Sequence, residues 1–189
     1  GRYKDLIKNI SERPEAVVNT FRDGKHFWKI NNDTNMKLDA IVGNPPYMIM
    51  DGGNGASATP IYDLFVDISK QTRPSYISMI TPSKWFAGGK GLDTFRETMK
   101  NDKHLRKIVD FINAKDCFPT ASIGGGVNYF LWKKDEEGPC EFINCRGRRR
   151  ITSVRYLQDF DVLIRYNEAI QILDKIQKFN ESSLINITT

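Results

Sequence analysis

The chain has 189 residues, with 40% hydrophobic and 27% charged side chains as in a globular protein, and no apolar run of the roughly 18 residues that a membrane span needs. The cysteines Cys117, Cys140 and Cys145 form no CxxC pair and leave an odd thiol, so we expect no disulfide framework, no metal site and a reducing, cytoplasmic location. The net charge of +5 is compatible with a nucleic-acid partner but does not require one.

In chain order, residues 1–35 form a polar lead-in, where Arg13-Pro14 interrupts any long helix. The apolar run 38–42 predicts a buried strand, and Gly43-Asn44-Pro45-Pro46 predicts a rigid turn directly after it. A glycine-rich loop follows at 51–57. A strand that runs into a rigid turn is where an open α/β sheet binds its ligands.

A helix is predicted next, with Thr59 as its N-cap and Pro60 in its first turn. Its apolar residues recur at helical spacing and predict one stripe for packing on a sheet: Ile61, Leu64, Phe65 and Ile68. The run 76–80 then predicts a second strand that ends in a turn at 81–83.

The rest of the pattern continues as α/β. Asp93 is predicted to cap a helix that carries Phe95 and Met99, and two more strands are predicted at 108–112 and 127–132. No helical pattern separates these last two strands, so we expect them to pair antiparallel, and the glycine triplet 124–126 to allow a close backbone approach. The alternation indicates an α/β layered sheet. Beyond residue 150 an amphipathic helix is predicted from its apolar spacing: Val162, Tyr166, Ala169, Leu173 and Ile176.

The tetrapeptide Asn44-Pro45-Pro46-Tyr47 (NPPY) carries the predicted chemistry. An aromatic amine is a poor nucleophile because its lone pair is delocalised into the ring. Two acceptors aimed at its hydrogens, the Asn44 side-chain oxygen and the Pro45 carbonyl, would favour a tetrahedral nitrogen and orient its lone pair. The prolines fix the backbone, and Tyr47 offers a ring on which a flipped-out base can stack.

NPPY resembles the catalytic motif of amino-methyltransferases that act on adenine in DNA. Three further segments extend the resemblance, at 61–65, at 80–86, and at 118–119 with 124–132. Together they resemble the methylase part of fused restriction-modification proteins of the Eco57I type, over residues 38–135. The resemblance implies a Rossmann-like sheet, transfer of methyl from S-adenosylmethionine to the N6 amine of adenine in duplex DNA, and Phe118 as a second wall of the base pocket opposite Tyr47.

The sequence departs from this family before Asn44. The glycine-rich loop that holds the methyl donor in the family is missing, since only Gly1, Gly24 and Gly43 precede Asn44. We therefore expect residues 36–135 to be the C-terminal half of a methyltransferase domain whose first half is absent, and 136–189 to be a basic loop and helical linker toward a missing target-recognition region. Alone, the chain is expected to be inactive, and its strand 38–42 to present an edge for self-association or for the rest of a parent polypeptide.

Basic residues suggest where DNA phosphates bind. The run 146–150 places four arginines in five residues, and two lysines follow the second strand. The candidate phosphate contacts are Lys84, Lys90, Arg146, Arg148, Arg149 and Arg150. A solvated loop is the alternative interpretation of the arginine run. No convincing endonuclease motif is present.

Other functions stay open at this point. NPPY also occurs where other planar amides and amines are methylated, so a protein-glutamine or RNA methyltransferase is the main rival. A DNA-binding specificity fragment that keeps the fold without catalysis is the non-enzymatic alternative. The N-P-x-Y pattern of peptide ligands is disfavoured, because those ligands lie in exposed segments and this motif follows a buried-looking strand.

Overall fold

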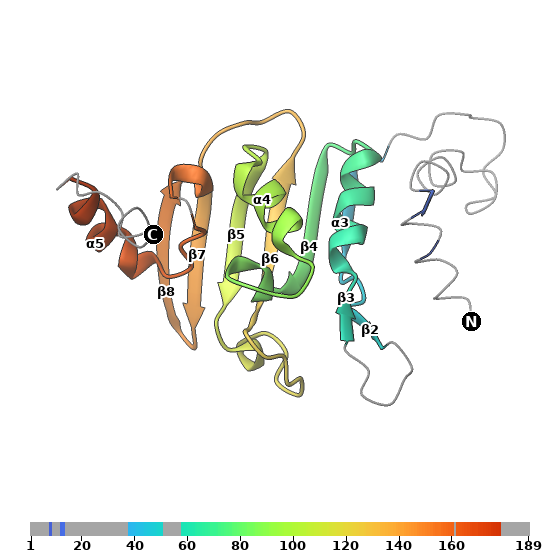
Figure 1. The fold of residues 1–189 in the computed structure, drawn as a ribbon, viewed down its shortest axis with the longest axis horizontal. Helices are drawn as coiled ribbons and strands as arrows, with labels where there is room; N and C mark the ends of the chain where they lie inside the picture. Colours follow the sequence, from blue (N-terminus) through green and yellow to red (C-terminus); the bar gives the residue numbers. More distant parts are fainter. Residues whose placement is uncertain (1–7, 9–11, 14–37, 51–57, 161, 179–189) are drawn as a thin grey trace, which may run out of the picture.

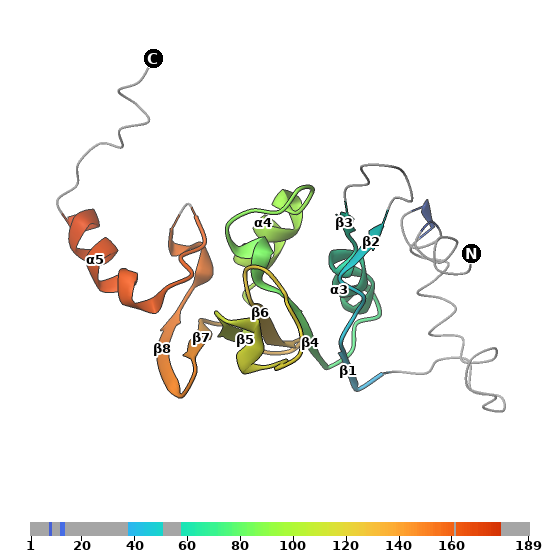
Figure 2. The same cartoon turned by 90° about the horizontal axis from the view of Figure 1, so that it is seen from below.

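A computed structural model describes residues 8, 12–13, 38–50, 58–160 and 162–178 (Figure 1). Within these residues the chain forms a six-stranded mixed sheet, with α3 and α4 side by side on one of its faces (Figure 2). The predicted α/β class is confirmed. The expected polar lead-in lies almost wholly outside the described residues, as do the glycine-rich loop 51–57 and the tail after 178.

The elements have the following bounds. The strands are β1 (Ala40–Gly43), β2 (Met48–Met50), β3 (Ala58–Pro60), β4 (Tyr76–Pro82), β5 (Leu105–Phe111), β6 (Val127–Lys133), β7 (Cys140–Arg146) and β8 (Arg149–Arg155). The helices are α3 (Tyr62–Gln71), α4 (Asp93–Asn101) and α5 (Asn167–Lys178), with short 3-10 turns η1 (Ser83–Phe86), η2 (Ala114–Asp116) and η3 (Leu157–Asp159).

The strand order in the sheet is β1-β4-β6-β5-β7-β8, and β2 pairs with β3 in a separate hairpin. β1 is parallel to β4, and β5 is parallel to β7, whereas β6 runs antiparallel to both of its neighbours. The antiparallel pairing predicted for the strands now labelled β5 and β6 is confirmed. β1, β4, β5 and β7 therefore share one direction, and their carboxyl ends meet at a single edge, the lower one in Figure 1. We call this the carboxyl edge.

The core lies between the sheet and the helices. Alternate residues of a strand face the same side, so Ile77 and Met79 of β4 are both buried against α3 and α4. The largest almost fully buried side chains are Trp85, Tyr62, Phe86, Phe130 and Phe142. Burial of each stabilises the fold by roughly 1.5–3 kcal/mol. Because Trp85 and Phe86 belong to η1, their burial fixes the turn that carries Ser83 and Lys84 at the carboxyl edge.

The predicted start of the first helix is wrong. Thr59 is not an N-cap but pairs with Ile49 in the β2–β3 hairpin, and α3 begins at Tyr62 without a side-chain cap. The Thr59-Pro60 pattern does not start the helix, because the backbone of residues 58–60 pairs with β2 as a strand. The predicted apolar stripe is also only partly right, since Leu64 and Phe65 pack with Ile68 in a small separate cluster. The α3 residues in the main core are Tyr62 and Val66.

Two strands were not anticipated after residue 135. β7 and β8 form an antiparallel hairpin that continues the sheet beyond β5, with Phe142 in the main core. β8 carries Arg149, Arg150 and Arg155, which hides its alternation from a hydrophobicity pattern. The helix predicted near the C-terminus is present as α5, although Val162 and Tyr166 precede it.

Candidate active site

The NPPY loop leaves the sheet at the carboxyl edge. β1 pairs with β4 as far as Gly43 opposite Met79, and the loop follows at once. Asn44 and Pro46 are exposed, Pro45 is buried, and Tyr47 is half-buried. A buried proline between exposed neighbours anchors the loop, because its ring packs inward and its φ is fixed. The exposed Asn44 amide is therefore presented to solvent from a rigid backbone.

Tyr47 is held by both its backbone and its ring. Its carbonyl accepts a hydrogen bond from the Ile61 N–H at 3.2 Å, which ties the loop to the start of α3. Its buried hydroxyl has no hydrogen-bond partner among the described residues. Burial raises the pKa of the Tyr47 phenol above its usual value, and the neighbouring Cys117 thiol raises it further. Tyr47 therefore stays neutral, and Cys117, which contributes to this shift, belongs to the segment after β5.

Phe118 belongs to that segment after β5. It is half-buried, follows Cys117 directly, and donates its backbone N–H to the Ala114 carbonyl at 2.8 Å, which continues the η2 turn. The topology thus places two aromatic residues, Tyr47 and Phe118, at the same edge from different strand ends. The sequence alone could only propose this through the family resemblance.

The turn after β4 packs against the glycine triplet. The Ser83 N–H donates to the Gly126 carbonyl at 3.0 Å, and Gly125 and Gly126 have φ values of +88° and +83°. A Cβ added to Gly126 would meet the Phe111 carbonyl oxygen at 2.3 Å, so the expected close backbone approach is confirmed. The exposed Lys84 lies over this loop, its Cγ 3.2 Å from where a Cβ of Gly125 would stand.

The arginine run forms the tip of the β7–β8 hairpin. Arg146 ends β7, Arg148 lies in the turn, and Arg149 and Arg150 begin β8, all of them exposed. The Gly147 N–H donates to the Asp116 carboxylate at 2.7 Å, so this turn is tied to η2. The hairpin tip therefore lies at the carboxyl edge with NPPY, Lys84 and Phe118.

The remaining basic candidate is Lys90. It is exposed in the turn between η1 and α4. It follows η1 closely in the chain, and η1 begins at the carboxyl edge. Lys90 therefore stays a candidate by its charge and its exposure.

Sequence reasoning missed a buried carboxylate below this edge. Asp110 of β5 is 0% exposed, and Arg165 pairs with both of its oxygens at 2.8 Å. A signal was available, because an aspartate inside the apolar run 108–112 is an anomaly that demands a buried partner. The partner could not be found from sequence, since Arg165 lies 55 residues away in the segment before α5.

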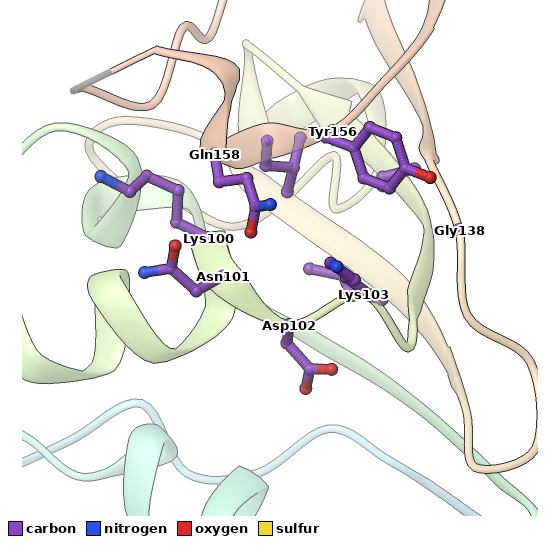
Figure 3. A pocket seen from close by; sticks show the side chains of 10 residues that line it. Lys100, Asn101, Asp102, Lys103, Gly138, Tyr156 and Gln158 are labelled. Atoms are coloured by element: carbon purple, nitrogen blue, oxygen red, sulfur yellow. The ribbon is translucent and has the colours of Figure 1, made fainter.

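Two hollows of the described residues lie away from the NPPY loop. A cavity of about 10 Å³, room for about one water, lies at the opposite edge, where β5 and β7 begin (Figure 3). A shallow hollow of about 320 Å³ lies among β5, β6, β7 and β8, with the exposed ion pair Lys107–Glu141 in it. Neither is lined by a residue of NPPY.

The described ranges hold no group of three or more His, Cys, Asp and Glu side chains arranged to bind a metal ion. None of the helices described is both long and apolar enough to cross a membrane. Cys117, Cys140 and Cys145 are all free thiols, with burial raising the pKa of each.

Comparison with known proteins gives a family match. Residues 1–118 match the sequence model of the Eco57I restriction-modification methylase family. A protein of Mycoplasma pneumoniae described as an uncharacterized adenine-specific methylase is 39% identical over 108 residues, which cover 54% of this chain and 25% of that protein. The match therefore spans about a quarter of the length of that relative.

Solved structures show weaker similarity. The type I restriction-modification methyltransferase subunit from Streptococcus thermophilus has a TM-score of 0.46 and 13% identity, over 85% of this chain and 36% of that one. The M protein of the type I restriction enzyme EcoKI has a TM-score of 0.40 and 15% identity, over 57% and 25% of the two chains. These similarities are too low for a shared function to be inferred from them.

Proposed function

The chain belongs to the Eco57I restriction-modification methylase family, and we propose that its carboxyl edge serves the transfer of methyl to the N6 amine of adenine in duplex DNA. The observation that carries the proposal is the NPPY loop at the end of β1, where exposed Asn44 precedes buried Pro45. The family match supports the reaction class, and the loop supplies residues suited to it.

The proposed chemistry requires no strong base. The Asn44 side-chain oxygen and the Pro45 carbonyl accept hydrogen bonds from the two amine hydrogens, which favours a tetrahedral nitrogen whose lone pair is available for attack. As the new nitrogen–carbon bond forms, the carbon–sulfur bond of a sulfonium methyl donor would break and leave a neutral thioether, and the nitrogen would then lose its extra proton to solvent water. Buried Pro45 holds its carbonyl in place, so the loop changes its conformation little when the base enters.

The implied methyl donor is S-adenosylmethionine, which supplies a methyl group on a sulfonium centre. The strand end fits a donor placed beyond it, because a Cβ on Gly43 would meet nothing within 4 Å and Asn44 is exposed. In this chain, Gly43 and Asn44 would border the donor. The residues that grip the rest of the donor would come from outside 38–178.

The target base would leave the duplex to reach this edge. Tyr47 offers a neutral aromatic ring for stacking, and Phe118 is proposed as the opposite wall. Both residues follow strands that end at the carboxyl edge, Tyr47 after β1 and Phe118 after β5, which supports this pairing.

Duplex DNA would be held along the same edge by its phosphates. Lys84 beside the glycine loop and the arginines at the β7–β8 tip are exposed and cationic. The proposed phosphate contacts are Lys84, Lys90, Arg146, Arg148, Arg149 and Arg150. Such contacts position the duplex without reading its sequence.

The rest of the domain would pair with β1. β1 has β4 on one side and no strand of the described residues on the other, and its Val42 is 78% exposed. An unpaired apolar edge favours association. We propose that the unpaired side of β1 is covered by another part of the parent polypeptide, or by a second copy when the chain is isolated.

The test is transfer of labelled methyl from S-adenosylmethionine by the full-length protein to duplex DNA, RNA and protein offered separately. The proposal expects label on DNA, recovered as N6-methyladenine. Label on glutamine side chains or RNA would assign the site to another planar amine or amide. DNA binding without any label would indicate a specificity module instead.

A further inference from the structure

Asp110 collects hydrogen bonds from three separate segments. Its Oδ1 accepts from the Ser83 hydroxyl at 2.7 Å and from Arg165 Nη2 at 2.8 Å. Its Oδ2 accepts from Arg165 Nε at 2.8 Å and from Asn144 Nδ2 at 3.3 Å. The carboxylate is fully buried and its charge is compensated, so it joins the turn after β4, the strand β7 and the segment before α5.

Arg165 also contacts the two loops that come next to NPPY along the carboxyl edge, the turn after β4 and the loop before β6. Its guanidinium lies 5.6 Å from the centre of the Phe86 ring in η1. Its Nη2 would be 2.9 Å from a Cβ on Gly126, so it packs directly against the backbone of the glycine triplet. Since Ser83 also donates its N–H to Gly126, the turn, the triplet and the ion pair form one unit.

Stability alone is a weak reason for such a pair. Well-packed hydrophobic residues often stabilise a core as well as a buried ion pair does, while the bidentate geometry of arginine fixes direction and distance. The position is informative as well, because the pair lies beneath Lys84 and not at a remote part of the sheet.

We propose that Arg165 is a positioning residue for methyl transfer. Through Asp110 it fixes the Ser83-Lys84 turn and the glycine triplet 124–126 where they meet the DNA beside NPPY. The inference rests on the proposed function for its catalytic readout. Its structural part, the fixing of two loops by one guanidinium, stands on the contacts alone.

A matched control is available at the opposite edge. Lys70 pairs with Asp102 at 2.7 Å, both are mostly buried, and Asp102 also accepts from Trp132 Nε1 at 2.9 Å. Lys70→Gln therefore removes a cation of similar burial, 16% exposed like that of Arg165, far from the loops in question.

The experiment compares full-length wild type, Arg165→Gln, Arg165→Lys and Lys70→Gln at a temperature where each is folded. We expect Arg165→Gln to lower kcat for DNA methylation by about 100-fold, with the KM for S-adenosylmethionine changed less than about threefold, because loop misplacement acts on the transition state. Arg165→Lys should recover part of the loss, and Lys70→Gln should keep wild-type kcat.

Hydrogen exchange of peptides covering 81–90 and 122–128 provides a readout independent of activity. We expect faster exchange in these peptides in Arg165→Gln but not in Lys70→Gln. This expectation holds even if wild type methylates no DNA, and that result would refute only the proposed function. Unchanged exchange in these loops, or equal kcat for Arg165→Gln and Lys70→Gln, would overturn the positioning role. If Arg165→Gln does not fold, the same comparisons are made with Arg165→Lys, which keeps the charge but not the bidentate geometry.

Discussion

The Ile61 N–H donates to the Tyr47 carbonyl at 3.2 Å, so the residue before α3 holds the last residue of the NPPY loop. The anchor Pro45 lies two residues earlier and is buried. The loop is thus fixed on both sides of Pro46, so the Asn44 amide and the Tyr47 ring are attached to a rigid backbone.

Two replacements of Tyr47 distinguish the role of its ring from the role of its hydroxyl. Tyr47→Ala should raise the KM for DNA by about 10- to 100-fold, because stacking of a base on an aromatic ring is worth about 1–3 kcal/mol. Tyr47→Phe should stay within about threefold of wild type, since the hydroxyl has no partner among the described residues. Methylation rates measured against DNA concentration check both. Tyr76→Ala, at the start of β4, is the matched control, and equal effects of Tyr47→Ala and Tyr76→Ala would contradict the stacking role.

Removal of charge from the hairpin tip should weaken DNA binding in a salt-dependent way. The double variant Arg148→Gln/Arg149→Gln should lower the slope of log K against log salt by about 1–2, because each phosphate contact contributes about 0.9. Fluorescence anisotropy of a labelled duplex at several KCl concentrations measures this slope. Lys103→Gln/Lys134→Gln makes the same change in net charge at the opposite edge. If it reduces the slope equally, the effect is one of net charge and not of contacts at the tip.

The glycine triplet is expected to tolerate no side chain at its last position. Gly126→Ala should lower the free energy of unfolding by at least about 2 kcal/mol, because φ is +83° and the new Cβ would meet two backbone carbonyls within 2.7 Å. Urea unfolding of the full-length protein measures the change. Gly88→Ala, where a Cβ would meet nothing within 4 Å, should cost less than about 1 kcal/mol. A small loss in Gly126→Ala would mean that the loop is free to move.

The buried thiol of Cys140 predicts a loss of stability at alkaline pH. Burial raises the pKa of Cys140 from 9.0 to about 12, although nearby Arg155 lowers it. The native state therefore keeps its proton where the unfolded state has lost it, and stability falls as pH rises from about 9 to 12.

At pH 10.5 this thiol should cost wild type on the order of 2 kcal/mol relative to pH 7. Cys140→Ala lacks the titrating group, so its own decline should be smaller by that amount, while losses from other groups cancel in the comparison. Urea unfolding of both proteins at the two pH values tests this. Parallel declines would show that Cys140 does not titrate differently on folding.

Strong local periodicity made much of the sheet predictable. The four predicted strands and the helix carrying Phe95 and Met99 are present, because runs such as Tyr76–Pro82 alternate apolar residues that a helix-covered sheet buries. Two details were wrong: Leu92 and not Asp93 is at the N-cap of that helix, and β1 is not buried, since it has a strand partner on one side only among the described residues. β7 and β8 were missed because the pairing of β7 with β5 is long-range and because the arginines of β8 obscure its apolar alternation. The false cap at Thr59 shows a local turn signal overridden by strand pairing with Ile49.

The candidate site also has a part that the sequence predicted and a part that it did not. NPPY could be located because a rigid turn after an apolar strand has one place in an α/β sheet. The convergence of Lys84, Phe118 and the arginine tip on that edge required the strand order, which no local pattern contains. The Asp110–Arg165 pair could not be predicted, because residues 55 positions apart in the sequence form no periodic pattern.

The most direct test of the account is the methylation activity of full-length Asn44→Ala beside wild type, with duplex DNA as acceptor. Asn44 is exposed, so its replacement should change the free energy of unfolding by less than about 0.5 kcal/mol. The account predicts that N6-methyladenine formation falls by at least about 100-fold while DNA affinity stays within about threefold. Near-wild-type methylation by folded Asn44→Ala would contradict it, because the reaction would then not depend on the NPPY loop.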